Sequence, residues 1–180
     1  YGMDLNRDRI VGLKKFNDNT GEIKHSELKK TVKNKLHLTN KIQDLKTCNV
    51  IIVTVPTPVK KNKSPDLSSI IKATKSLSLI LKKGDTVVYE STVYPGLTEE
   101  VCVPIIEEIT NFKYNKDFYV GYSPERINPG DKVHRLESIT KIVSGSNKKT
   151  LKFLAKLYGS IIKAGVYRAP NIKTAEAAKV

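Results

Sequence analysis

The stretch Val50-Ile51-Ile52-Val53-Thr54-Val55 is a continuous apolar run. Such runs are typical of a parallel strand that is buried on both faces. Pro56-Thr57-Pro58 ends the run, and the apolar residues of 67–81 then repeat with the period of a helix, for which Asp66 is the expected N-cap. Thr86-Val87-Val88-Tyr89 follows as a second buried strand. This segment therefore predicts a strand–helix–strand unit.

The same alternation continues in both directions along the chain. Helices are expected at 7–15, 26–35, 98–110, 148–161 and 172–180, and short strands at 36–38, 118–122, 142–143 and 166–168. Strands that alternate with helices over short connections form βαβ units and a parallel sheet. The predicted class is α/β with a doubly wound sheet, and the chain shows no internal repeat or low-complexity tract.

Composition excludes several classes of protein. The 180 residues are 39% apolar and 28% charged, which is enough apolar material for a sizeable core. The sequence has no run of 18 uncharged apolar residues, so no membrane helix is expected, and Tyr1 to Arg9 lacks the pattern of a secretory signal. The two cysteines, Cys48 and Cys102, exclude a disulfide-dense scaffold and indicate a reducing cytoplasm.

The net charge of +14 indicates an anionic partner. Of the 32 basic residues, 27 are lysines scattered in ones and twos and only five are arginines. Arginine is the usual reader of base edges and of phosphate, so this distribution favours solvated lysine-rich helix faces over a nucleic-acid interface. A basic nucleic-acid-binding α/β module remains an alternative hypothesis.

Ligands of open parallel sheets bind beyond the carboxyl ends of the strands. Asp4 ends the first strand, where an acid accepts hydrogen bonds from an adenosine ribose, and Arg9 can flank the adenine. The alternative for Asp4 is a helix N-cap. Thr57 is held between two prolines, in a loop that suits a cofactor-lining role or an ordinary strand-ending turn.

Two further loops follow strands. In the loop from Glu90 to Gly96, the hydroxyl groups of Ser91 and Thr92 precede a Pro-Gly turn and the start of a helix. This loop can provide hydrogen bonds to a ligand, and the helix start is a favourable position for an anion. The alternative is that the two hydroxyl groups only cap the local backbone. Glu125 lies between prolines and is a candidate general base, although it can also pair within its loop. Positive charge for a diphosphate comes from Arg126, Lys132, His134 and Arg135.

No metal site is expected. His25, His37 and His134 are far apart and show no ligand spacing with the cysteines. Both cysteines are interpreted as small buried apolar residues, because neither lies in a glycine-rich loop that would activate a thiolate.

Taken together, these segments resemble the nucleotide-sugar (UDP-sugar) 6-dehydrogenases, over essentially the whole chain and in order. The likeness rests on Tyr1-Gly2-Met3-Asp4-Leu5-Asn6, Val53-Thr54-Val55-Pro56-Thr57-Pro58, Glu90-Ser91-Thr92-Val93-Tyr94-Pro95-Gly96, Tyr122-Ser123-Pro124-Glu125-Arg126-Ile127-Asn128-Pro129-Gly130-Asp131 and Ala175-Glu176-Ala177-Ala178-Lys179. The third and fourth runs most resemble the UDP-N-acetylhexosamine branch, including enzymes of Vi-type capsular polysaccharide synthesis. In the UDP-glucose branch, the loop that corresponds to the fourth run has the sequence Pro-Glu-Phe-Leu-x-Glu-Gly. Here Pro129 stands in place of the second Glu of that loop, so no role of that Glu is assigned to this chain.

The resemblance implies a Rossmann-like fold and oxidation of the C6 alcohol of a UDP-sugar to a carboxylate, with two NAD reduced in succession and a cysteine-bound thioester. It implies that Asp4 and Arg9 bind the adenosine half of NAD, and that Thr57 and Thr92 lie near the nicotinamide ribose and the reacting centre. The alternatives are a UDP-glucose 6-dehydrogenase and a hydroxyacid-type dehydrogenase, of which the second is disfavoured by the 125–131 loop.

The resemblance assigns substrate binding to Glu125, Arg126 and Lys179. It also assigns activation of the hydrolytic water to Glu125 and stabilisation of oxyanion charge to Lys179. Residues 1–170 are expected to be an NAD-binding domain without its first βα unit, and 171–180 the start of a central inter-domain helix that forms a homodimer. The glycine-rich turn is expected before Tyr1 and the nucleophilic cysteine after Val180, so the parent is expected to be an enzyme and this polypeptide alone inactive.

Overall fold

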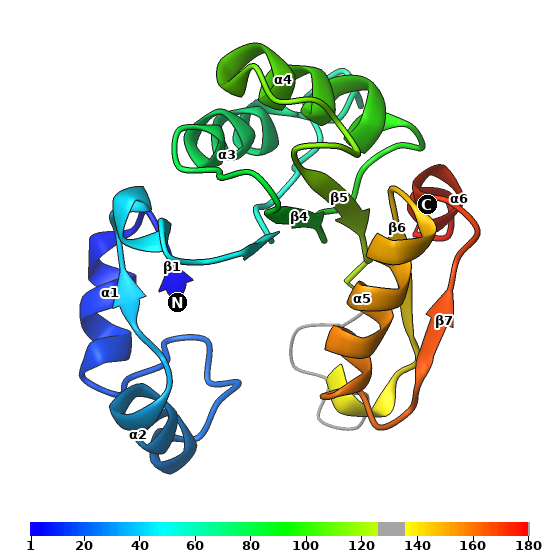
Figure 1. Cartoon of the computed structure of the whole chain (residues 1–180). Coiled ribbons are helices and arrows are strands. Elements are labelled where there is room, and N and C mark those ends of the chain that lie inside the picture. The colour runs from blue at the N-terminus through cyan, green and yellow to red at the C-terminus, as the bar shows by residue number, and fades with distance from the viewer. Residues whose placement is uncertain (126–135, 180) are drawn as a thin grey trace. The chain divides into compact units, whose positions relative to one another are not determined.

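The computed structural model describes residues 1–125 and 136–179. The chain forms two compact units, Tyr1–Cys48 and Asn49–Val180 (Figure 1). The first unit contains β1 (Gly2–Met3), α1 (Arg7–Lys14), α2 (His25–Asn34), β2 (Leu38–Thr39) and the 3₁₀ turn η1 (Ile42–Leu45). β1 and β2 pair in parallel, and the buried apolar residues are Ile10, Leu28 and Leu45. The predicted helices are confirmed, whereas the strand expected at 36–38 begins two residues later.

The second unit contains a five-stranded sheet in the order β3 (Val50–Val53), β4 (Thr86–Tyr89), β5 (Tyr119–Tyr122), β6 (Lys141–Gly145) and β7 (Val166–Arg168). β4 is buried along its whole length, as predicted. β3 is one of the two edge strands of this sheet, and Ile52 on it is 44% exposed, so the prediction that β3 is buried on both faces is wrong. An edge strand has only one neighbour to help cover its side chains.

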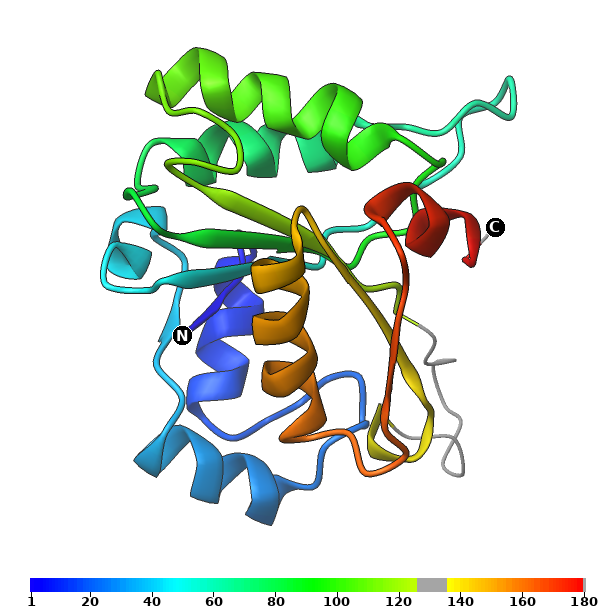
Figure 2. The same cartoon turned by 45° about the vertical axis from the view of Figure 1, so that its right-hand side comes forward.

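Helices cover both faces of this sheet (Figure 2). One face carries α3 (Ser68–Ser78) and α4 (Val103–Thr110), and the other carries α5 (Lys148–Gly159). The core under α5 consists of Val88, Val143, Leu154, Tyr158 and Ile162. α3 starts one residue later than predicted, after Leu67, although Asp66 still accepts the Ser68 N–H at 2.9 Å.

Two predicted helices differ from the structure. The helix expected at 98–110 is a π-turn, η2 (Thr98–Cys102), followed by α4, in which Pro104 has no N–H for the ladder. The helix expected at 172–180 is α6 (Ile172–Ala177), which Asn171 caps by accepting the Thr174 N–H.

The predicted α/β class with helices on both faces of the sheet is confirmed, but the sheet is mixed and not wholly parallel as predicted. β6 is antiparallel to β5, whereas β6–α5–β7 is a parallel unit. A parallel pair needs a crossover, usually a helix. The described part of the β5–β6 connection contains only the 3₁₀ turn η3 (Leu136–Ser138) and no α-helix.

Candidate functional site

The carboxyl ends of β3, β4 and β5 lie side by side. Val53 pairs with Tyr89, and Tyr89 with Tyr122, so the loops after these strands leave the sheet at one edge. Backbone bonds continue the ladder beyond the strands, because the Glu90 N–H donates to the Val53 carbonyl at 2.9 Å and the Glu125 N–H to the Glu90 carbonyl at 3.4 Å. The loops predicted to form a site therefore meet, as expected for a parallel sheet.

Hydroxyl groups join the loops after β3 and β4. Thr57 Oγ1 donates to the Thr92 carbonyl at 2.6 Å, and Ser91 Oγ donates to the Val55 carbonyl at the same distance. Thr57 is half-buried and Thr92 is exposed. The structure thus brings the two predicted cofactor-binding threonines together, on a rigid edge that can line a ligand.

The helix start after Pro95-Gly96 already holds an anion, the side chain of Glu176 from α6. This carboxylate is completely buried and accepts the Gly96 N–H at 2.5 Å and the Thr98 N–H at 2.9 Å. The predicted chemistry of the helix start is right, because a carboxylate is stabilised there, but the anion belongs to the chain itself. Sequence reasoning did not single out Glu176, since an acid among alanines looks like a solvated helix face.

The structure also brings Glu125 and Lys179 together. Lys179 Nζ donates to the backbone carbonyl of Glu125, although α6 ends at Ala177, two residues before this lysine. The Glu125 side chain is 39% exposed, so its carboxylate reaches solvent at the sheet edge. A partly exposed carboxylate, on a residue whose backbone carbonyl binds an ammonium, is an arrangement that can handle a proton and stabilise an oxyanion.

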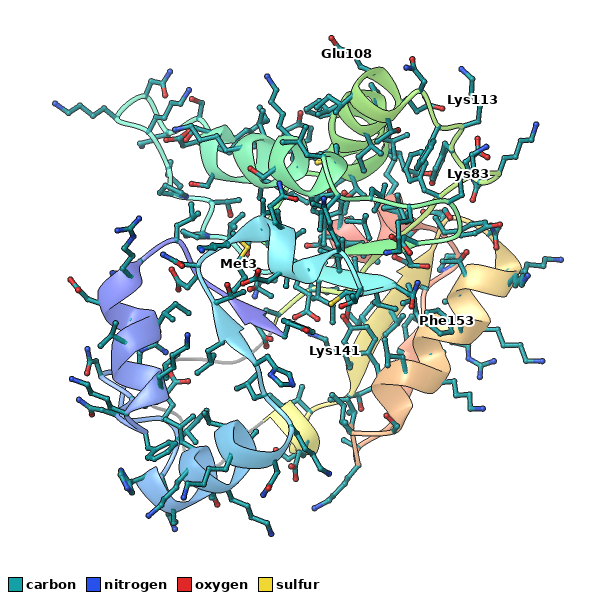
Figure 3. The ribbon with its side chains drawn as sticks, turned by 60° about the vertical axis from the view of Figure 1, so that its left-hand side comes forward. Met3, Lys83, Glu108, Lys113, Lys141 and Phe153 are labelled. Atoms are coloured by element: carbon teal, nitrogen blue, oxygen red, sulfur yellow. The ribbon has the colours of Figure 1, made fainter. Side chains whose placement is uncertain are left out.

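A buried network lies beneath Glu125. Lys141 lies at the start of β6 (Figure 3). Its ammonium is 3.3 Å from Glu90 Oε2, 3.7 Å from Glu125 Oε2 and 3.2 Å from the carbonyl of Pro124. Tyr158 Oη donates to Glu90 Oε1 at 2.5 Å. Burial and the charge of Glu90 raise the pKa of Tyr158 well above its ordinary value, so this phenol stays protonated. Sequence reasoning missed this network, because its members come from four separated segments.

Asp4 and Arg9 belong to the first unit. Asp4 is exposed and its Oδ1 accepts the Asn6 N–H at 2.8 Å. The N-cap of α1 is Asn6, which accepts the N–H groups of Asp8 and Arg9, so the alternative of Asp4 as the cap is wrong. Arg9 Nη1 donates to Asp18 Oδ1 at 3.1 Å, an intramolecular partner that the sequence did not suggest.

The remaining residues named from the sequence are the charged residues of the 126–135 segment and the two cysteines. Arg126 lies outside the described residues, as do Lys132, His134 and Arg135. Cys102 is buried as predicted, and burial raises the pKa of its thiol to about 11, whereas Cys48 is only half-buried.

Within residues 1–125 and 136–179, no three metal-ligating side chains lie close enough together to hold a metal ion. None of the helices there has the length and apolar character needed to cross a membrane.

Comparison with known proteins gives a consistent result. Residues 1–162 match the NAD binding domain of the UDP-glucose/GDP-mannose dehydrogenase family. Over 99% of its length the chain is 52% identical to a UDP-N-acetyl-D-glucosamine 6-dehydrogenase of Pseudomonas aeruginosa and 49% identical to the protein CapL of Staphylococcus aureus. It spans 42% of each of these relatives. The solved structure of a UDP-D-ManNAc dehydrogenase from Pyrococcus horikoshii is similar with a TM-score of 0.88 at 31% identity, over 99% of this chain and 42% of that one.

Proposed function

Because the chain belongs to the UDP-glucose/GDP-mannose dehydrogenase family, we propose that it forms the NAD-binding part of an enzyme that oxidises a UDP-N-acetylhexosamine. The reaction converts the C6 alcohol of the sugar to a carboxylate and reduces two NAD, for the synthesis of a surface polysaccharide. The observation that carries the proposal is the meeting of Glu125 and Lys179 at the sheet edge, beside the joined loops of Thr57 and Thr92.

The residues present fit NAD. Asp4 has an exposed carboxylate directly after a strand, where it can accept hydrogen bonds from a ribose. Thr57 and Thr92 line the carboxyl edge of the other sheet, the place at which α/β proteins bind nucleotides. NAD accepts the hydride from the substrate carbon when it is bound.

Glu125 and Lys179 supply the groups that act on the substrate. The Glu125 carboxylate is partly exposed and can accept a proton from a sugar hydroxyl or from water. Lys179 is held by the Glu125 carbonyl and presents a cation where negative charge develops on the substrate oxygen. A fixed cation of this kind stabilises an oxyanion without having to reorganise during the reaction.

The choice of substrate follows the relatives that are about 50% identical to the chain over the 179 residues that they align with. Two of them are UDP-N-acetyl-D-glucosamine 6-dehydrogenases, from Pseudomonas aeruginosa and Salmonella typhi. The substrate class proposed here is therefore the UDP-N-acetylhexosamines, with the gluco isomer as the first to test. We also propose a cytoplasmic homodimer whose contact involves the helix that begins at 171–180.

The test is a comparison of UDP-sugars with the protein expressed from its complete coding sequence. NADH formation is followed with UDP-N-acetylglucosamine, UDP-N-acetylgalactosamine and UDP-glucose. At least one N-acetylhexosamine is expected to give a kcat/KM about tenfold or more above that of UDP-glucose, since a site that pairs with the acetamido group leaves polar groups unpaired when it is missing. A preference for UDP-glucose would overturn the substrate assignment, and no NADH with any UDP-sugar would overturn the proposed function.

A further inference from the structure

Lys141 carries a buried charge that the proposed reaction does not use directly. Its side chain is only 4% exposed, and a buried ammonium is stable only when it is surrounded by acceptors. Three acceptors surround it, the carboxylates of Glu90 and Glu125 and the carbonyl of Pro124. The ring of Tyr158 lies below it, with 5.5 Å between Nζ and the ring centroid. These contacts come from the ends of β4 and β5, the start of β6, and α5.

The most buried part of this network, formed by Glu90 and Tyr158, is held by hydrogen bonds. One oxygen of Glu90 faces Lys141 and the other accepts the Tyr158 hydroxyl, and the Glu90 side chain is only 10% exposed. Glu125 is different, because its side chain is 39% exposed. Lys141 is thus anchored on one side by Glu90 and Tyr158 and presents its charge to Glu125 on the other.

The segment Pro124–Glu125 is held at three backbone atoms. The Glu125 N–H donates to the Glu90 carbonyl, the Pro124 carbonyl accepts from Lys141, and the Glu125 carbonyl accepts from Lys179. Lys141 also approaches the carboxylate of Glu125. The contacts of Lys141 therefore include both the backbone and the side chain of this segment.

We propose that Lys141 is a positioning residue, whose buried ammonium holds the Glu125 carboxylate and the Pro124–Glu125 backbone in the geometry that acts on the substrate. The proposal rests on the proposed function, in which Glu125 contacts the sugar. Small displacements of a reacting group lower turnover steeply, so a side chain that fixes Glu125 affects kcat more than cofactor binding.

The test compares two variants with a control in the protein expressed from its complete coding sequence. Replacing Lys141 alone would leave Glu90 as an unpaired buried carboxylate, so Lys141→Met is combined with Glu90→Gln, because a neutral replacement of a buried ion pair is usually tolerated. Glu90→Gln alone retains the ammonium. Lys163→Met is the control, since Lys163 is 83% exposed and pairs only with the exposed Glu137 among the described contacts. Lys141→Gln with Glu90→Gln replaces the double variant if that variant does not fold.

In the folded double variant, kcat is expected to fall by about 30-fold, while the KM for NAD stays within about twofold of the wild-type value. This is the pattern expected when a lost interaction acts only in the chemical step. Glu90→Gln alone is expected to lose no more than about threefold, and Lys163→Met to match the wild type within about twofold. A folded double variant with kcat within about threefold of the wild type would overturn the proposal.

A second readout does not depend on the reaction. Amide hydrogen exchange, measured on the 180-residue chain, is expected to be about tenfold or more faster at the Glu125 N–H in the double variant and unchanged at Ser123, whose N–H donates to the Tyr89 carbonyl. If the wild-type protein oxidises no UDP-sugar, the proposed function fails and exchange alone decides this inference. Faster exchange at Glu125 supports the role of Lys141, and unchanged exchange overturns it.

Discussion

Asp18 organises the loop that follows α1. Its carboxylate accepts the N–H groups of Thr20, Glu22 and Ile23, the hydroxyl of Thr20 and a guanidinium N–H of Arg9. The side chain is only 3% exposed. Burial by itself raises the pKa of this carboxyl, but the hydrogen bonds from Thr20, Ile23 and Arg9 outweigh it and lower the pKa from 3.8 to about 2.

Asp18→Asn is expected to lower the free energy of unfolding by about 1–2 kcal/mol near neutral pH, because the hydrogen bonds lose a charged acceptor. The folded-state pKa is lowered, so the contribution of Asp18 is fully present above pH 3.8 and is lost as the pH falls through about 2. The free energies of unfolding of wild type and variant, measured with urea, should therefore differ near neutral pH and converge near pH 2. A difference that stays constant down to this pH would contradict the assignment.

Asp4 is predicted to set the preference for NAD over NADP. A carboxylate accepts from the ribose 2′-hydroxyl and repels a 2′-phosphate. Asp4→Asn should reduce the NAD/NADP ratio of kcat/KM by about tenfold or more in the protein expressed from its complete coding sequence. Asp8→Asn is the control, since Asp8 is another exposed acid four residues further along the chain. A ratio unchanged by Asp4→Asn, or equally changed by both variants, would count against Asp4.

Glu125 is predicted to act in the chemical step. Glu125→Gln keeps the size of the side chain but removes the carboxylate, so turnover should fall by about 100-fold or more, a typical contribution of a general base. The Kd for NAD should stay within about twofold, because the contact proposed for this residue is with the substrate and not with the cofactor. Glu137→Gln, in an exposed pair, is the matched control. Near-normal turnover of Glu125→Gln would remove the assignment.

At the scale of secondary-structure elements, α6 is attached to the start of η2 by a single buried carboxylate. Glu176 accepts two backbone N–H groups there, while Thr98 Oγ1 is buried without a hydrogen-bond partner among the described atoms. The second link between the same elements is the pair of Lys173 and Glu100, which is about two-thirds exposed on both sides. Buried charged acceptors contribute far more to stability than exposed ion pairs.

Glu176→Gln should therefore lower the free energy of unfolding by about 2–3 kcal/mol, because hydrogen bonds to charged groups are worth this much. Glu100→Gln, which removes the exposed link, should cost no more than about 0.5 kcal/mol. Thermal or urea unfolding of the chain measures both. Equal effects of the two substitutions would show that α6 is not held by Glu176.

Most elements could be predicted from the sequence, because their signals are local. Apolar runs located β3, β4 and β5, and the helix expected at 148–161 is α5, which Asn147 caps by accepting the Thr150 N–H. The direction of β6 could not be predicted, because it depends on the connection after β5 and not on the residues of the strand. The π-turn before α4 and the early end of α6 were also missed, since periodicity does not distinguish hydrogen-bonding patterns within a helix.

At the scale of the whole molecule, the sequence motifs pointed to residues that lie together in the fold, but not to the buried residues beneath them. Thr57 and Thr92 meet, as the order of loops along the sheet edge suggested. Glu125 and Lys179, which only the resemblance linked through the substrate, also meet. Their partners were missed for a physical reason. A buried acid or lysine is recognisable only from what surrounds it, and Glu90, Lys141 and Tyr158 are brought together by the fold from positions far apart in sequence.

We propose that the enzyme built on this chain oxidises the C6 alcohol of a UDP-N-acetylhexosamine to the carboxylate. The most direct measurement is the ratio of NADH formed to sugar consumed at completion, using the protein expressed from its complete coding sequence. Two hydride transfers predict two NADH for each UDP-N-acetylhexosamine that disappears, with the UDP-uronic acid as the product. One NADH for each sugar, with the aldehyde as the product, or consumption of the sugar without NADH, would contradict the claim.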